Sequence, residues 1–185
     1  MARLYLTVLV LFLLPAVVFK GGARLMSMVS GPHTVAGQKP LNQRWLGYNA
    51  EAVAGYWKAL GEAGRLAAEP RFLELDLVFP TLYGTAFAVS LLTASAKLGC
   101  PLHVAWVIAP VVVTVIADWV ENLVQLDQLR DYIKSDKKDV TALDPKWIRL
   151  ASTATSVKLI FFVISSLALI VLLYMLLRSP GAVVA

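Results

Sequence analysis

The feature that most constrains this chain is a long uncharged segment near its C-terminal end. Residues 159–177 run for nineteen positions without a charge, between Lys158 and Arg178. As a helix rising about 1.5 Å per residue, this segment is about 28 Å long, close to the thickness of a bilayer's hydrocarbon core. A soluble domain would have to bury such a helix on every face. The segment therefore predicts a membrane span.

Three further apolar blocks lead to a fold class for the whole chain. They cover Leu4–Phe19, Leu77–Ala96 and Leu102–Ala117. Charged residues make up only 16% of the sequence, against about a quarter in ordinary soluble domains. We predict an all-α, polytopic integral membrane protein that forms a single domain over residues 1–185. Its four transmembrane helices are expected near residues 4–19, 77–97, 102–123 and 153–177.

The N-terminal block has the charged start and apolar core of a signal peptide, with Arg3 ahead of sixteen apolar residues. The residues after Phe19 do not form a small-residue cleavage pattern, so we expect an uncleaved first span.

The basic residues predict the orientation of the spans. Of the seventeen Lys and Arg residues, fourteen lie in or beside the two long connections, and only Arg3, Lys97 and Arg178 lie at the other ends of the spans. By the positive-inside rule, both long connections face the cytoplasm and both termini lie outside it. We expect a multi-pass protein of the cell inner (cytoplasmic) membrane. The net charge of +5 fits attraction to anionic lipid headgroups, and no basic and aromatic pattern indicates nucleic-acid binding.

The two long connections contain their own helix signals. Residues 20–48 are rich in Gly, Pro and polar residues, which predicts an irregular loop. Asn49 then starts a helix whose aromatic face suggests a cytoplasmic amphipathic helix lying on the membrane surface. A following helix, with Pro70 in its first turn, is expected to run unbroken through Pro80 into the second span. The third span should continue beyond the membrane as far as Ser135, and Asp144 should cap the start of the last helix.

Counting along the second and third spans predicts a polar cluster. Only residues 97–101 join these spans, so they must form a hairpin. Asp76 lies twenty-three residues before Gly99 and Asn122 lies twenty-three after it, so the two residues should have similar depth. The candidate cluster at the cytoplasmic end comprises Asp76, Asp118, Glu121, Asn122 and Lys158. Pro80 should also leave the backbone carbonyl of Asp76 without its helical partner.

Two interpretations of this cluster stay open. Charges at the edge of apolar blocks often mark span boundaries or hold helices in register. Carboxylates beside a helix at lipid depth are costly, however, and usually face the interior of the bundle or a functional pocket.

Other candidate sites have weaker support. His103, at the outer end of the third span, is a weak candidate for binding a tetrapyrrole metal. With one cysteine, Cys100, and with His33 far from His103 in the sequence, neither a disulfide nor a zinc site is expected. No cofactor can be assigned.

Two functions follow from these observations. The first is an accessory or assembly subunit of a larger membrane complex, in contact with the lipid bilayer and with other membrane subunits, and not itself an enzyme. It rests on the absence of a catalytic residue set in the sequence. The alternative is a membrane enzyme or carrier for a lipid or quinone-like molecule, which would use the acidic cluster at the cytoplasmic interface.

Overall fold

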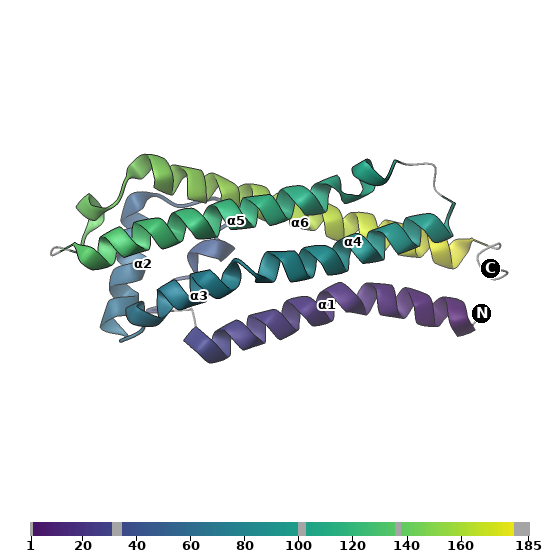
Figure 1. Cartoon of the computed structure of the whole chain (residues 1–185), viewed down its shortest axis with the longest axis horizontal. Helices are drawn as coiled ribbons and strands as arrows, with labels where there is room; N and C mark the ends of the chain where they lie inside the picture. The colour runs from purple at the N-terminus through teal and green to yellow at the C-terminus, as the bar shows by residue number, and fades with distance from the viewer. Residues whose placement is uncertain (1, 31–34, 100–102, 136–137, 180–185) are drawn as a thin grey trace.

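The computed structural model describes residues 2–30, 35–99, 103–135 and 138–179 (Figure 1). Over these residues the fold is all-helical and contains no β-strand. The α-helices are α1 (Ala2–Ser30), α2 (Ala50–Glu62), α3 (Glu69–Asp76), α4 (Phe79–Lys97), α5 (Val104–Lys134) and α6 (Pro145–Arg178). Three short 3₁₀ helices lie between them: η1 (Leu41–Gln43), η2 (Leu66–Ala68) and η3 (Val140–Ala142).

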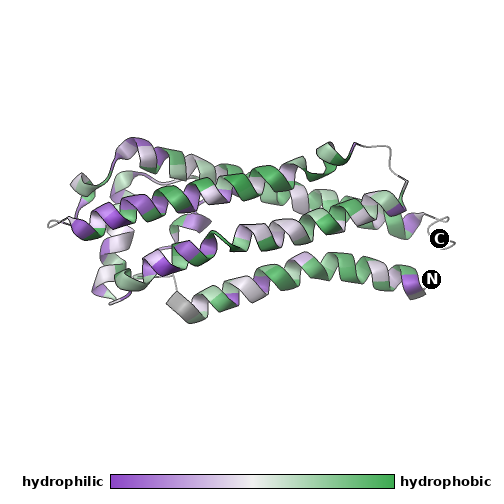
Figure 2. Cartoon of the chain, in the orientation of Figure 1, coloured by the Kyte–Doolittle hydropathy of each residue, from purple (hydrophilic) through white to green (hydrophobic). Residues whose placement is uncertain are grey.

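Four helical segments are long and apolar enough to cross a membrane, as the sequence predicted. They are Arg3–Met28, Leu66–Lys97, Val104–Lys134 and Pro145–Arg178, which contain 26, 32, 31 and 34 residues. Hydrophobic residues cover the middle of all four segments in Figure 2. The four pack side by side as a bundle, and α5 and α6 share the most extensive interface.

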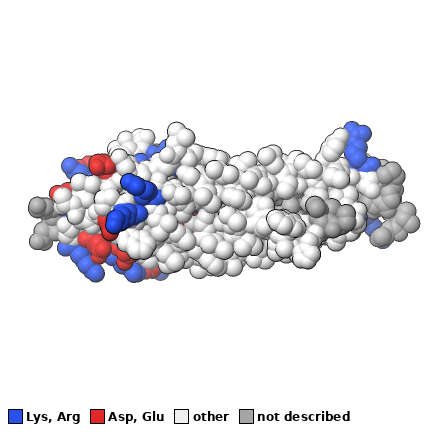
Figure 3. All heavy atoms as spheres, turned by 90° about the horizontal axis from the view of Figure 1, so that it is seen from above, with Lys and Arg blue, Asp and Glu red and all other residues white. Residues whose placement is uncertain are grey.

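The two ends of the bundle differ in charge. The first and last helices both have their chain-terminal ends at the right of Figure 1, whereas α2, η3 and the long connections lie at the left. On the face shown in Figure 3, acidic and basic side chains gather at the left end, and a wide uncharged band separates them from a few basic atoms at the right. This separation by charge agrees with the uneven distribution of Lys and Arg in the sequence.

The first helix is longer than expected, and this corrects the predicted loop. Residues 20–30 continue α1 and are not irregular. One of the two glycines serves packing: a Cβ placed on Gly22 would lie 1.9 Å from the ring of Phe79, whereas one on Gly21 would meet nothing within 4 Å. Gly22 thus permits close approach of α1 to α4, and the two glycines do not end the helix.

A second correction concerns the expected unbroken helix into the second span. The helix breaks at Leu77 and Val78, between α3 and α4. Pro80 has no N–H for the carbonyl of Asp76, and the N–H of Thr81 bonds to Val78 at 3.2 Å instead of to Leu77. Two consecutive carbonyls, those of Asp76 and Leu77, are therefore free to bond elsewhere.

The predicted helix starts at Asn49 and Asp144 are confirmed. Asn49 accepts a bond from the N–H of Ala52 at 2.9 Å, and Asp144 accepts one from Lys146 at 2.8 Å. The aromatic face of α2, with Tyr56 and Trp57, is buried within the protein. Its placement on a membrane surface remains a prediction.

The connection between α1 and α2 is held against α6. The N–H of Tyr48 donates to the hydroxyl of Ser152 at 2.7 Å, and the hydroxyl of Ser156 donates to the carbonyl of Trp45 at 3.1 Å. Gly47, at φ +79°, passes so close to Ser152 that a Cβ there would lie 2.5 Å from its Oγ. These contacts hold the backbone of residues 45–48 against α6.

Candidate functional site

One face of α5 carries a buried polar stripe. Asp118, Glu121, Asn122 and Gln125 follow one another at helical spacings of three and four residues, which places them on one side of the helix. Glu121 and Asn122 are fully buried, and Asp118 is 4% exposed. Buried carboxylates require a partner, and the neighbouring helices supply it.

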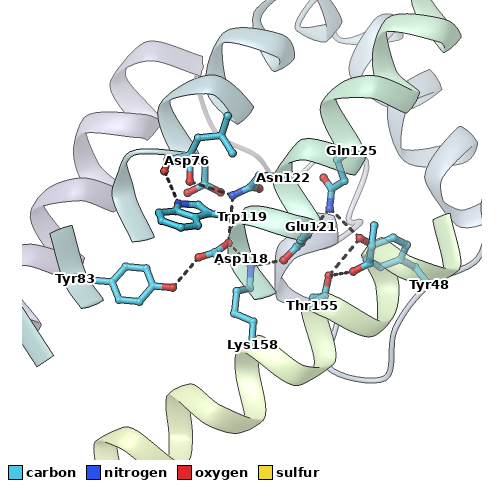
Figure 4. Close-up of polar contacts among 12 residues, drawn as sticks. Tyr48, Asp76, Tyr83, Asp118, Trp119, Glu121, Asn122, Gln125, Thr155 and Lys158 are labelled. Atoms are coloured by element: carbon cyan, nitrogen blue, oxygen red, sulfur yellow. Dashed lines mark hydrogen bonds and ion pairs between the residues drawn. The ribbon is translucent and has the colours of Figure 1, made fainter. Parts of the chain in front are cut away.

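Lys158 of α6 is the cation that pairs with this stripe (Figure 4). Its Nζ lies 3.0 Å from Asp118 Oδ1, forms a second ion pair with Glu121 Oε2, and belongs to a side chain that is itself buried. One ammonium group therefore joins two carboxylates one helical turn apart, and it ties α6 to α5 at this level.

Asn122 and Trp119 use the two carbonyls freed by the helix break. Asn122 Nδ2 donates to the carbonyl of Asp76 at 3.0 Å, and Trp119 Nε1 donates to the carbonyl of Leu77 at 2.8 Å. The Asn122 amide also donates to Asp118 Oδ1 at 3.2 Å. The contact between Asn122 and Asp76 agrees with the depth obtained by counting from Gly99.

Tyr83 completes the set around Asp118. Its hydroxyl donates to Asp118 Oδ2 at 2.7 Å, so Asp118 contacts α4, α5 and α6 together (Figure 4). The structure thus brings all five candidate residues into one cluster: Asp76, Asp118, Glu121, Asn122 and Lys158. Among the described residues, Asp76 is the one carboxylate of this cluster with no ion pair.

A second branch of the network was missed by sequence reasoning. Gln125 Nε2 donates to Glu121 Oε1 and to the hydroxyl of Tyr48, both at 2.9 Å, and Thr155 Oγ1 lies 3.2 Å from the same hydroxyl. Burial raises the pKa of the Tyr48 phenol, and the charge of Glu121 raises that pKa further, so the hydroxyl stays neutral. Extending the α5 stripe by one turn would have found Gln125, but no spacing pattern points to Tyr48.

A cavity of about 450 Å³ opens beside this cluster, between α1, the η1 connection, α3, α4, α5 and α6. Its floor includes Asp76, Asp118 and Lys158. Its walls include six aromatic side chains, those of Phe19, Phe72, Phe79, Tyr83, Phe162 and Trp45, beside aliphatic residues and the polar residues Ser27, Asn42 and Gln43. A concave apolar site with a few convergent polar groups is the usual form of a small-molecule site.

The remaining candidates lie elsewhere. His103 is exposed at the start of α5, where its Nδ1 accepts a bond from the N–H of Ala105 at 3.3 Å, so it acts as a helix cap there. Cys100 and His33 lie outside the described residues. Within the described ranges, no group of three or more His, Cys, Asp or Glu side chains is arranged to hold a metal ion.

Comparisons with protein-family models, with curated proteins and with solved structures find no match to this chain. A charged floor under aromatic walls can bind the polar group of a molecule whose remainder is apolar.

Proposed function

We propose that this chain spans the membrane four times and binds an amphiphilic, lipid- or quinone-like molecule in the cavity beside Lys158. The observation that carries the proposal is the lining of this cavity, where aromatic walls surround a floor with Asp76, Asp118 and Lys158. An amphiphile needs both surfaces in one site, one for its polar group and one for its apolar body.

The depth of the site supports a ligand drawn from the bilayer. Lys158 and Arg178 bound the apolar part of α6 and are twenty residues apart, which corresponds to about 30 Å of helix and to the hydrocarbon thickness of a bilayer. If Arg178 lies at one headgroup region, Lys158 lies at the other. The cavity then opens at the boundary between headgroups and hydrocarbon, where the polar groups of lipids reside.

The distribution of basic residues supports a cytoplasmic position for the site. The cluster lies towards the end that holds both long connections, and these connections carry most of the seventeen basic residues. Under the positive-inside rule this end faces the cytoplasm, and both termini face the opposite side.

The polar groups of the floor suit the binding of a ligand more than its chemical conversion. Asp118 and Glu121 are engaged by Lys158, and Asp118 also accepts the bond from Tyr83. Groups locked in mutual contacts form a fixed binding surface, which favours a carrier or binding protein over an enzyme. The other hypothesis, an accessory subunit packed against a larger membrane complex, stays a prediction that the same experiment tests.

The test is purification of the full chain in a mild detergent, followed by mass spectrometry of bound small molecules and copurifying proteins. Ala23 lines the cavity, so Ala23→Phe should fill part of it and reduce the bound amphiphile at least about tenfold, which is a loss of about 1.4 kcal/mol of binding. Val17→Phe adds a similar ring on an exposed face of the same helix and serves as the matched control.

The proposal fails if the wild-type chain carries no small molecule beyond the composition of the bulk lipid. It also fails if both variants retain the molecule equally. A stoichiometric partner protein in place of a small molecule would favour the accessory-subunit hypothesis.

A further inference from the structure

A second, apolar groove continues from the candidate site. It has a volume of about 300 Å³ and lies between α1, α4 and α6. Most of its lining is apolar, with Phe12, Ala16 and Leu169 among the residues, and Lys20 of α1 is the one charged side chain that lines it. Phe19 and Phe162 line both this groove and the first cavity, and their ring centroids are 5.4 Å apart. The two spaces are therefore neighbours, divided by one pair of aromatic rings.

The groove lies deeper in the apolar part of the bundle than the charged floor. Leu169 and Ile170, at its far end, come eleven and twelve residues after Lys158 on α6, about 17 Å along the helix. In the membrane orientation proposed above, the groove runs from the headgroup boundary towards the middle of the bilayer. This is the path that the hydrocarbon tail of a molecule with its head on the floor would take.

The polar cluster beside the cavity contains more acidic than basic side chains. Asp76, Asp118 and Glu121 are opposed by one buried cation, Lys158, which gives the cluster a formal charge of −2 with all four groups ionised. Lys158 is the only basic side chain among the residues that line the cavity, and both of its ion pairs are with cluster carboxylates. A phosphate head would meet repulsion there, whereas a cation would offset charge that is costly at this depth.

The walls favour the same class of ligand. Phe79, Tyr83 and Phe162 line the cavity next to the acidic floor, and Tyr83 meets both phenylalanine rings edge to face, at centroid distances of 5.2 and 6.2 Å. Aromatic faces attract ammonium groups, most strongly where water is excluded. Because the acidic groups of the described ranges are not arranged to hold a metal ion, an organic cation fits the site better than an inorganic one.

We propose that the ligand is a single-chain amphiphile with an ammonium head, which rests on the floor beside Asp76 while its tail occupies the groove between α1 and α6. This inference rests on the proposed function and adds to it the charge of the head and the course of the tail. Asp76 is the expected contact of the head, because it lines the cavity and is the carboxylate that Lys158 does not pair with.

The test uses the full chain in nanodiscs of zwitterionic lipid and three photoactivatable probes with dodecyl tails. The probes carry a trimethylammonium, a phosphate or a maltoside head and a diazirine at the end of the tail. Mass spectrometry then locates the labelled residues. We expect the ammonium probe to label groove residues of α1 and α6 at least about tenfold more than the phosphate probe, equivalent to about 1.4 kcal/mol.

Two variants test the contact of the head and the path of the tail separately. Asp76→Asn should reduce groove labelling by the ammonium probe about tenfold, whereas Glu51→Gln, on the exposed side of α2, should leave it unchanged. Ala16→Phe should block the groove and move the label elsewhere.

The wild-type comparison decides the inference even if a variant fails to fold. Equal or stronger groove labelling by the phosphate or maltoside probe overturns the ammonium head and leaves the proposed function standing. Ammonium labelling outside the groove overturns the tail path. If none of the probes labels the cavity or groove above the lipid-exposed background, both the inference and the proposed function are wrong.

Discussion

Replacing Lys158 by methionine is the sharpest test of how the helices are held together at the charged end. Methionine keeps a long apolar side chain and removes the charge. The change leaves the carboxylates of Asp118 and Glu121 buried without their cation. The neutral donors from Tyr83 and Gln125 remain, but they cannot balance two negative charges.

The expected loss follows from the burial of this pair. Breaking a buried ion pair by removing one partner costs about 3–5 kcal/mol. A buried carboxylate without its cation can take up a proton, which limits the loss of folding free energy to about the lower end of this range. Arg130→Met is the matched control, because Arg130 also pairs across helices, with Glu74 at 3.3 Å, but both side chains are about half exposed, at 53% and 54%. Such a pair contributes about 0–1 kcal/mol.

Thermal unfolding followed by size-exclusion chromatography in detergent measures the difference. For a chain of this size, about 1 kcal/mol shifts the melting temperature by roughly 2–4 °C. Lys158→Met should therefore melt at least about 6 °C below the wild type, and Arg130→Met within about 4 °C of it. Adding Asp118→Asn and Glu121→Gln to Lys158→Met should recover much of the loss, because amides carry no charge to strand. Equal melting of the two single variants would refute the argument from burial.

Two further predictions concern orientation and helix packing. In a cysteine-free background, Lys39→Cys should react with an impermeant maleimide only from the cytoplasmic side, because Lys39 is exposed in the first long connection. Labelling of this cysteine from outside intact cells would show that the orientation is the opposite one. Gly22→Ala should lower the free energy of unfolding by about 1–3 kcal/mol, because the added Cβ would overlap the ring of Phe79. Gly21→Ala places its Cβ in open space and should be neutral or stabilising, since alanine is the better helix former. Both glycine variants are compared by thermal unfolding, and equal stability of the two would contradict the close contact of α1 with α4.

The parts of the fold that depend on one helix or one hairpin could be predicted from the sequence. Apolar length alone indicates each span, and the short turn around Gly99 fixes the pairing of its two neighbours. Depth in an antiparallel hairpin follows from counting residues, so the contact between Asp76 and Asn122 needed no knowledge of side-chain packing. Helix caps such as Asn49 are equally local, because the capping side chain bonds to an N–H three residues away.

The wrong predictions concern residue types that can either shape the local backbone or pack against a distant part of the fold. Glycine and polar residues after Phe19 are typical of a loop, but Gly22 packs against a ring of α4, a partner more than fifty residues away in the sequence. Pro80 is expected from the sequence to lie within one unbroken helix. It separates two helices because Asn122 and Trp119 of α5 bond to the freed carbonyls, and these donors stabilise the break.

The cavity lay beyond sequence reasoning for a related reason. α1 is apolar around its whole circumference over residues 4–19, so its sequence has no polar stripe to show which face packs on the bundle. The cavity wall depends on that choice, since Phe19 and Ala23 line the site from α1. Another part of the wall depends on Trp45, whose carbonyl accepts a bond from the Ser156 hydroxyl of α6. The charged floor could thus be predicted as a cluster, but the cavity above it and the neighbouring groove depend on how α1 packs against α6, because residues of both helices line the two spaces.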